Sequence, residues 1–138
     1  MRIMGLDVGD KRIGVALSDP LKLTAQGQCV IERRSPDADL DRITAICMEY
    51  QVGKIVVGLP LNMNGTEGPK ALEIRTFARK LQNCSRLPVE FYDERLTTKS
   101  AERLLINADV SRKKRKQVID KLAAVNILQH YLDRGSIK

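Results

Sequence analysis

The stretch GLDVGDKRIGVALSD, residues 5 to 19, decides the fold. An apolar run leads into Asp7, a glycine turn follows, and a second apolar run ends at Asp19. The segment between the runs is too short for anything but a hairpin turn, so we expect antiparallel strands over residues 2–7 and 12–18. The first strand then ends on a carboxylate. Asp7 is either a turn residue, or a metal ligand or phosphate-handling group held at the edge of a sheet.

The rest of the chain alternates between helical and extended patterns. Apolar residues spaced three or four apart predict helices, and short β-branched or alternating runs predict strands. In chain order we expect a strand over 24–32, a helix after Ser35-Pro36, a buried strand over 54–59, a loop over 60–69, a helix around 72–81, a strand over 88–92, a helix over 96–107 and a last helix from about 111. The apolar stripes of three of these helices are Leu40, Ile43, Ile46 and Cys47, then Leu72, Phe77, Ala78 and Leu81, and finally Val118, Leu122, Val125, Leu128 and Leu132.

The order of these elements, βββαβαβαα, predicts an α/β fold. An antiparallel meander followed by alternating helices and strands implies a mixed five-stranded sheet with helices packed on it. This is the layout of a ribonuclease H-like fold, although other α/β folds share it. No repeat or linker divides the sequence, so we expect residues 1–138 to form a single domain with a real hydrophobic core.

The net charge of +7 is unevenly placed along the chain. Of 24 basic and 17 acidic side chains, residues 111–138 hold 8 basic and 2 acidic ones, which leaves 16 and 15 for residues 1–110. A consecutive run supplies most of the excess: Arg112, Lys113, Lys114, Arg115 and Lys116. Such a run attracts polyanions, nucleic acid above all. A solvated loop and first helical turn is the plainer interpretation of the same run.

The cysteine spacing and the hydropathy indicate in which cellular compartment we expect the protein. Cys29, Cys47 and Cys84 are widely spaced and include no CxxC pair, so we expect small buried residues in a reducing cytosol. No apolar run approaches the roughly 20 residues of a membrane helix, and the first residues do not form a secretory signal. With His130 as the one histidine, a histidine-rich metal site or a Ser-His-Asp triad has little support. We expect a cytoplasmic protein that binds no membrane.

Acidic residues interrupt three otherwise apolar patterns. Asp7 ends the first strand, Asp93 and Glu94 end the fifth, and Asp120 lies in the last helix. The residues that follow Asp120 at helical spacing are Ala123, Ala124, Ile127 and Tyr131. That spacing places Asp120 on the buried side of the helix. Burying an unpaired carboxylate costs free energy, so we expect a cation next to Asp120.

Carboxylates from two strand ends and a helix would converge at one edge of the sheet. Their oxygens suit Mg²⁺ or Mn²⁺, which prefer carboxylate and water ligands. Two such ions, about 3.5–4 Å apart, activate a water and stabilise the leaving oxygen in phosphodiester cleavage. Structural interpretations also stand for each position: a turn cap for Asp7, an ion pair with Lys116 for Asp120, and a helix cap for Asp93-Glu94.

Four ordered motifs together resemble one family: DVGDKRIGVALSD, VVGLPLNMNGTEGP, FYDERLTT and DKLAAVNILQHYL. They span essentially the full chain and are similar to the YqgF/RuvX family of Holliday junction resolvases, also described as pre-16S ribosomal RNA nucleases. The resemblance implies a ribonuclease H-like fold, a cytoplasmic bacterial protein and a divalent-metal-dependent nuclease that matures the 5′ end of 16S rRNA. Holliday junction resolution is the alternative activity.

Matched by position, the acidic triad of that family falls on Asp7, Glu94 and Asp120, the expected catalytic and metal-binding residues. Arg12 would lie near the site and contact phosphate. The GLP loop, with Gly58 and Pro60, would let nucleic acid approach a bare backbone. Further phosphate contacts are implied for Arg95, Thr97 and Thr98.

One departure from the wider ribonuclease H pattern affects the triad. The strand over 54–59 ends without the carboxylate that many of those enzymes place there, so the next strand supplies the second acid. Adjacent residues on a strand point to opposite faces, and only one of Asp93 and Glu94 faces the metals easily. The resemblance favours Glu94.

Two rival functions fit parts of the sequence. Kinases and ATPases of the actin and sugar-kinase type also begin with DxGxxxxG, but they clasp ATP between two such domains, and this chain has the length of one. A nucleic-acid-binding factor without catalysis, acting for instance in transcription, would explain the basic run but not the acids. Junction resolution requires a dimer, and the sequence leaves a monomer and a homodimer equally open.

Overall fold

The computed structural model describes residues 1–93 and the helix over 112–135, the latter without the side chains of 112–120 and 135. The described elements are β1 (Arg2–Val8), β2 (Arg12–Ser18), β3 (Ala25–Glu32), α1 (Pro36–Glu49), β4 (Val52–Leu59), α2 (Pro69–Ser85), β5 (Val89–Asp93) and α4 (Arg112–Gly135). Each predicted strand is present, with ends shifted by two residues at most. The helix expected over 96–107 lies outside the described residues.

The five strands form one mixed sheet in the order β3-β2-β1-β4-β5. β1, β2 and β3 make the predicted antiparallel meander, and β4 and β5 join β1 in parallel. The carboxyl ends of β1, β4 and β5 therefore meet at one edge of the sheet, where Asp7, Leu59 and Asp93 lie. This edge brings together parts of three of the motifs that were singled out from the sequence.

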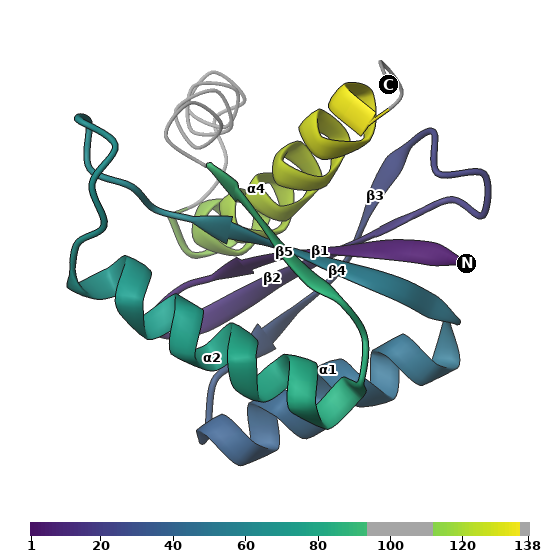
Figure 1. The fold of residues 1–138 in the computed structure, drawn as a ribbon, viewed down its shortest axis with the longest axis horizontal. Coiled ribbons are helices and arrows are strands. Elements are labelled where there is room, and N and C mark those ends of the chain that lie inside the picture. The colour runs from purple at the N-terminus through teal and green to yellow at the C-terminus, as the bar shows by residue number, and fades with distance from the viewer. Residues whose placement is uncertain (94–111, 136–138) are drawn as a thin grey trace.

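Helices cover both faces of the sheet (Figure 1). α1 and α2 pack on one face, where they bury alternate strand residues such as Met4, Leu6 and Val57 in the larger core. α4 crosses the other face over a smaller core that includes Ile3 and Val56. Successive residues of a strand alternate between these two cores because side chains on a strand point to opposite faces. We call the two surfaces the α1/α2 face and the α4 face.

α4 lies unusually close to the sheet at Gly5 of β1. A Cβ atom at Gly5 would come within 2.7 Å of Leu128 Cβ and 3.1 Å of the carbonyl oxygen of Ala124. A side chain at Gly5 would push the helix away, so this glycine sets the distance between α4 and β1. Over Gly27 of β3 an added Cβ would instead meet the flexible side chain of Lys121, which can move aside.

Polar contacts hold α4 at its carboxyl-terminal half. The Gln129 side-chain oxygen accepts a 2.8 Å hydrogen bond from the Ala25 amide, and its amide nitrogen donates to Leu23 O at 3.1 Å. Tyr131 donates to Glu90 of β5 and accepts from Lys54 of β4 at 3.0 Å. The hydrogen bond to the Tyr131 hydroxyl is the main cause that raises the pKa of Lys54, and the charge of Glu90 also raises it. These contacts join the helix to β3, β4 and β5.

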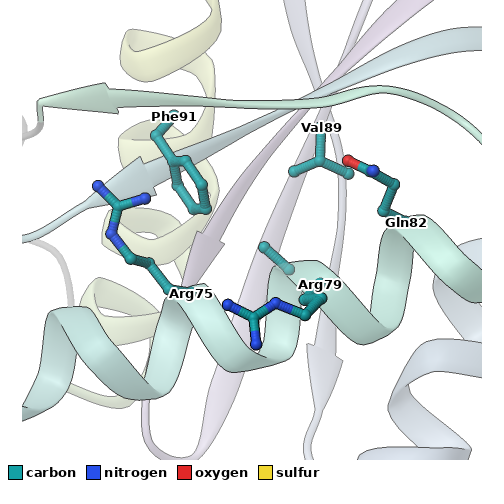
Figure 2. Close-up of a pocket in the computed structure, with 6 residues that line it drawn as sticks. Arg75, Arg79, Gln82, Val89 and Phe91 are labelled. Carbon is teal, nitrogen blue, oxygen red and sulfur yellow. The ribbon is translucent and has the colours of Figure 1, made fainter.

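α2 packs against β5 through a mixed aromatic and basic contact (Figure 2). Val89 and Phe91 of β5 point toward the helix, and the guanidinium of Arg75 lies 4.7 Å from the centre of the Phe91 ring. Arg75 also forms a two-pronged ion pair with Glu67, the second bond being 3.0 Å. The loop that precedes α2 is thereby fastened to the helix.

The expected apolar faces of two helices need correction. Leu72 is 57% exposed, and the small Ala71 beside it is fully buried instead. Among the described side chains of α4, the buried ones are Ala123, Ala124, Ile127, Leu128 and Leu132, while Leu122 and Val125 are only half-buried. Both helices thus turn a line that includes alanines toward the sheet. Small residues allow the close approach that larger ones would prevent.

The cysteines were expected to be buried, and this is wrong for Cys84. Cys47 is buried beside Met4, with 3.9 Å between the sulfur atoms, and burial raises the pKa of its thiol to about 11. Cys29 is half-buried, whereas Cys84 is exposed near the end of α2. Within the described part of the chain, no helix has the length and apolar character needed to span a bilayer.

Candidate active site

Asp7 lies on the α4 face of the sheet, close to the end of β1. Ile3 and Gly5 precede it at alternate positions and both contact α4 or its core. Its partner on β2 is Gly14. On the other side, Gly58 follows the Leu6–Val57 pair and so occupies the level of Asp7 on β4. The half-buried carboxylate therefore has a glycine on each neighbouring strand, and no side chain of those strands crowds it.

The helix α4 brings Asp120 toward this same end of the sheet. Gln129 lies at the level of Ala25, near the start of β3, and Lys121 lies beside Gly27. β3 runs in the same direction as β1, and α4 runs in the opposite direction. Residues nearer the amino terminus of α4 therefore lie nearer the end of β1 that carries Asp7. Asp120 precedes the buried Ala124 by four positions and shares its helical face. Its side chain is outside the described part of the structure.

Of the two adjacent acids, Asp93 is the last residue of β5. Asp93 pairs with Leu59, which belongs to the core on the α1/α2 face. Its neighbour Tyr92 belongs to the opposite core, where its ring meets His130 edge-on with 6.2 Å between centroids. By alternation Asp93 lies on the α1/α2 face, away from the face of Asp7. Glu94 lies outside the described residues.

The remaining predicted site residues lie partly within and partly outside the described part of the structure. Arg12 begins β2, two residues before Gly14 on the α4 face, so it shares the face of Asp7. Gly58 and Pro60 lie at the end of β4, as expected. The basic run from Arg112 to Lys116 forms the first turns of α4, without described side chains. The implied phosphate-binding residues outside the described part are Arg95, Thr97 and Thr98.

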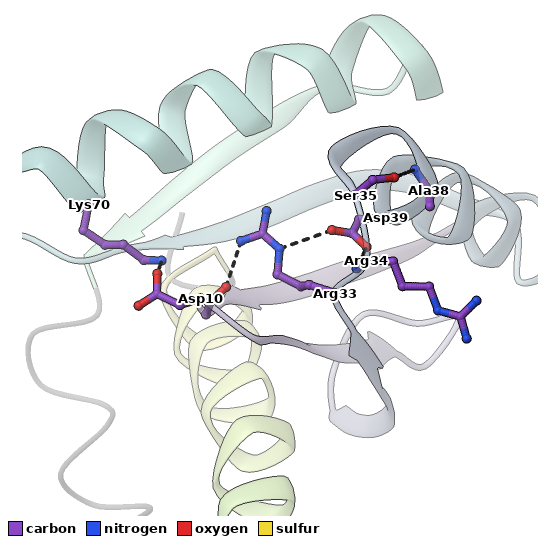
Figure 3. A network of polar contacts seen from close by, with 8 residues as sticks. Asp10, Arg33, Arg34, Ser35, Ala38, Asp39 and Lys70 are labelled. Carbon is purple, nitrogen blue, oxygen red and sulfur yellow. Dashed lines mark hydrogen bonds and ion pairs between the residues drawn. The ribbon is translucent and has the colours of Figure 1, made fainter.

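A polar network behind the β1–β2 turn was missed from the sequence (Figure 3). Arg33 donates to Gly9 O at 2.9 Å and to the carboxylate of Asp39 at 3.2 Å. Asp39 is 1% exposed, and its other oxygen accepts from the Arg34 amide at 3.1 Å. The turn that follows Asp7 is thus tied to the start of α1. An acid near the start of a helix resembles an ordinary helix-terminal residue, so nothing in the sequence marked Asp39 as buried.

A second ion pair fixes the same turn from the side of α2. Lys70, in the first turn of that helix, donates to Asp10. The hydrogen bond and charge of Lys70 lower the pKa of Asp10 below its ordinary value. Gly14 was also missed, although an isolated glycine within a strand is a recognisable signal of close approach. Together these residues shape the surroundings of Asp7 without being acids of the predicted triad.

Comparison with known proteins places the chain in a family. Residues 1–134 match the RuvX family, described as Holliday junction resolvase. The chain belongs to the RuvX family. A relative from Syntrophomonas wolfei, named "Putative pre-16S rRNA nuclease", is 61% identical over 137 residues, which cover 99% of this chain and 97% of the relative. The family resemblance inferred from the four motifs is confirmed.

Solved structures confirm the ribonuclease H-like fold of this RuvX-family chain. RuvC of Thermus thermophilus, in complex with a Holliday junction substrate, superposes with a TM-score of 0.58 at 16% identity, covering 99% of this chain and 96% of RuvC. The fowlpox virus resolvase in complex with Holliday junction DNA gives a TM-score of 0.60 at 12% identity, covering 97% of this chain and 98% of the resolvase. At these identities the likeness concerns the fold alone.

Membership of RuvX makes the chain a hydrolase of the nuclease class. The family match spans the chain, and it favours a nuclease over both rival functions, an ATP-dependent kinase and a binding factor without catalysis. Nucleases of this fold generally use divalent metal ions. Among the residues with described side chains, no group of three His, Cys, Asp or Glu is placed to hold a metal.

Proposed function

We propose that the chain is a divalent-metal-dependent endonuclease whose catalytic acids and metal ligands are Asp7, Glu94 and Asp120. The observation that carries this proposal is the position of Asp7 on the α4 face, between two glycines and at the end where α4 brings Asp120. In an ordinary strand this site would hold apolar side chains. Here it holds a carboxylate with a glycine on each neighbouring strand.

The second acid follows from the two faces of the sheet. Asp93 shares the face of Leu59, so it is turned away from Asp7. A strand that continued for one more residue would carry Glu94 to the face of Asp7. This supports Glu94 over Asp93.

The chemistry of the donors fits a hard cation. Asp7 supplies carboxylate oxygens, and the flanking glycines Gly14 and Gly58 leave room for water ligands and a phosphate. Magnesium or manganese ions held by Asp7, Glu94 and Asp120 would supply an activated water and stabilise the leaving oxygen. Arg12 would contact a substrate phosphate from β2, as would Arg95, Thr97 and Thr98 beyond β5. The basic run Arg112–Lys116 would bind the nucleic-acid backbone at the start of α4.

The substrate that we propose is structured RNA, namely the 5′ end of pre-16S rRNA. The name of the Syntrophomonas relative supports it at 61% identity. Holliday junction resolution is the second candidate because it is the description of the matched family. We further propose a cytoplasmic protein with one domain over residues 1–138. A monomer would suffice for RNA processing, whereas symmetric cutting of a junction would require a homodimer.

The test compares the protein with its Asp7→Asn variant on two substrates, a precursor-rRNA fragment and a four-way DNA junction. We expect Mg²⁺- or Mn²⁺-dependent cleavage of the rRNA fragment by the wild type. The variant should lose at least about a thousandfold in rate while it retains binding, because the amide keeps the shape of the side chain but not its charge. Binding is measured by fluorescence anisotropy and cleavage by gel electrophoresis.

Two results would contradict the proposal. Cleavage that survives Asp7→Asn, or that continues in a chelator, would exclude a metal site built on this carboxylate. Cleavage of the junction with no cleavage of the rRNA fragment would replace the proposed substrate by the second candidate. An Asp41→Asn variant is the matched control, since Asp41 is an exposed acid on α1 with no part in the site.

A further inference from the structure

A row of arginines follows the side of α2 that faces β5. Arg75, Arg79 and Gln82 lie four and three residues apart and share one flank of the helix, and Arg86 follows as the residue that ends it. Figure 2 shows Arg75, Arg79 and Gln82 on this flank, opposite Val89 and Phe91 of the strand. We call the space between this flank and β5 the arginine groove.

The arginine groove follows β5 from its start to Phe91. A hollow of about 210 Å³ is lined by the arginines at positions 75 and 79 together with Gln82, Val89 and Phe91. A second, shallower hollow begins at Gln82 and ends at Arg86 and Pro88. The groove lies on the α1/α2 face and runs from the carboxyl end of α2 toward the edge of the sheet where β5 ends, the edge that carries Asp7 on the opposite face.

The charge of the groove is largely unneutralised. Arg75 is held by Glu67 and lies over Phe91. Arg79 and Arg86 are exposed, and neither forms an ion pair with the described residues. The groove therefore offers two available guanidinium groups on one line, with a third fixed at the end nearer the catalytic edge. Guanidinium groups bind phosphate with two parallel hydrogen bonds.

The backbone of Arg86 is unusual for its residue type. It ends α2 in the left-handed conformation, with φ of 60°, and its amide donates to Gln82 O at 2.9 Å. Glycine is the usual residue at such a helix end, because any side chain costs free energy there. An arginine at this point extends the row by one more positive charge. Its side chain offers the fold no contact among the described hydrogen bonds and ion pairs.

We propose that the arginine groove binds an unpaired strand of the nucleic-acid substrate as that strand leaves the catalytic edge. The proposal rests on the proposed function, since it adds a path for the same substrate. The hollow lies between one helix and one strand and is lined by two arginines. Positively charged grooves that follow the backbone are typical of proteins that bind single strands without reading their sequence. Arg79 and Arg86 contact the phosphates, and Arg75 stays bound to Glu67.

The experiment uses three RNA hairpins: one without a tail, one with a single-stranded 5′ tail and one with a 3′ tail, each tail about ten nucleotides long. Binding to the full chain is measured by anisotropy in a chelator, so that it needs no cleavage. The test variant is Arg79→Gln/Arg86→Gly. The matched control is Lys80→Gln/Lys22→Gly, because Lys80 lies on the other flank of α2 and Lys22 also has a left-handed backbone, with φ of 63°.

We expect one of the tails to strengthen wild-type binding about tenfold at about 0.1 M salt, and the test variant to lose that gain. Loss of two phosphate contacts to a single strand should lower the salt slope for the tailed hairpin by about 1.4. Binding of the hairpin without a tail should not change, and the control variant should behave as the wild type. Since glycine suits position 86, the thermal midpoint should be retained or raised, which excludes misfolding as the cause.

The inference is overturned if neither tail strengthens wild-type binding, if the test variant keeps the full gain, or if the control loses as much. Failure of the proposed function gives a separate signal, namely no cleavage of any hairpin or of the rRNA fragment with Mg²⁺ or Mn²⁺. The tail readout does not depend on cleavage, so the two failures are distinguishable.

Discussion

Arg33 donates a 2.9 Å hydrogen bond to the carbonyl oxygen of Gly9, and the same guanidinium pairs with the buried carboxylate of Asp39. One side chain thus connects the turn after Asp7 with the first turn of α1. Its guanidinium also lies 5.4 Å from the centre of the Phe77 ring on α2. The turn that ends β1 is therefore held from the α1/α2 face, opposite the face that carries Asp7.

Replacing Arg33 by alanine should destabilise the fold. Asp39 is 1% exposed, so the substitution leaves a buried carboxylate without its charged partner. Removing one partner of a fully buried pair costs about 3–5 kcal/mol. Since the Arg33 side chain is itself 23% exposed, we expect the free energy of unfolding to fall by about 2–3 kcal/mol. Urea denaturation followed by circular dichroism measures this change.

The control for this prediction is Arg34→Ala. The Arg34 side chain is exposed, and only its backbone amide contacts Asp39, so its loss should change the stability by less than about 0.5 kcal/mol. Equal stabilities of the two variants would show that the ion pair is not needed to keep Asp39 buried.

Replacing Gly5 by alanine should move α4 and reduce nuclease activity more than stability. The new methyl group would lie 2.7 Å from Leu128 Cβ and 3.1 Å from Ala124 O, so the helix must shift outward. Overpacking of this kind costs about 1–3 kcal/mol. Because α4 carries Asp120, we expect cleavage at saturating substrate to fall at least about tenfold at a temperature where the variant is fully folded.

A matched glycine is available at the opposite end of the sheet. A Cβ atom at Gly53 would meet only the side chain of Met1, a 74% exposed terminal residue that can move aside. Gly53→Ala should therefore change neither stability nor cleavage appreciably. Full activity of Gly5→Ala would mean that the position of α4 does not limit the reaction.

The adjacent acids at the end of β5 should differ sharply in their importance. Asp93 shares the face of Leu59, so Asp93→Asn should reduce the cleavage rate less than about tenfold. Glu94→Gln should reduce it at least about a thousandfold if Glu94 is a metal ligand. Single-turnover cleavage with Mn²⁺ and with Mg²⁺ measures both rates. A greater loss for Asp93→Asn would assign the second ligand to Asp93 and contradict the inference from strand alternation.

Neutralising the start of α4 should weaken binding of nucleic acid through its phosphates. The variant Lys113→Gln/Lys114→Gln/Arg115→Gln removes three charges from the first turns of the helix. If all three contact phosphates, the salt slope for duplex binding should fall by about 2.7. The control Lys22→Gln/Arg34→Gln/Lys80→Gln removes as many charges from exposed positions elsewhere. An unchanged slope in the test variant would identify the run as ordinary solvated surface.

The strands and their order were predictable because their signals are local. β2 begins and ends where the sequence places it, at Arg12 and Ser18, since a hairpin turn and Asp19 bound a continuous apolar run. The larger core is formed by residues of the kind that such runs supply, for instance Ile43 and Ile55. Hydrophobic periodicity and turn chemistry carry this information without knowledge of tertiary contacts.

The buried faces of the helices were less predictable, because small residues rather than large ones are buried where a helix packs closely on the sheet. Leu72 was expected to face the sheet and is exposed, while Ala71 beside it is buried. Similarly, Ala123 and Ala124 are more deeply buried in α4 than Leu122. Close approach requires small residues on both partners, and a stripe of large residues does not reveal it.

Within the site, the sequence indicated Asp7 but not the residues that surround it. The absence of a β2 side chain beside Asp7 depends on Gly14, which lies directly opposite on β2 only because of the strand register. The role of Arg33 depends on a contact across 24 residues of sequence. Such relationships arise from tertiary structure, so a single sequence cannot supply them.

The two glycines beneath α4 have a mechanical consequence. The helix rests on β1 at Gly5 and on β3 at Gly27, two strands that are separated by β2. The support at Gly5 is the closer one, because Ala124 O and Leu128 Cβ lie against the strand backbone there, whereas the nearest atoms over Gly27 belong to the side chains of Lys121 and Val125. The depth at which α4 lies on the sheet is therefore set near the middle of the helix, by a residue that carries no side chain at all.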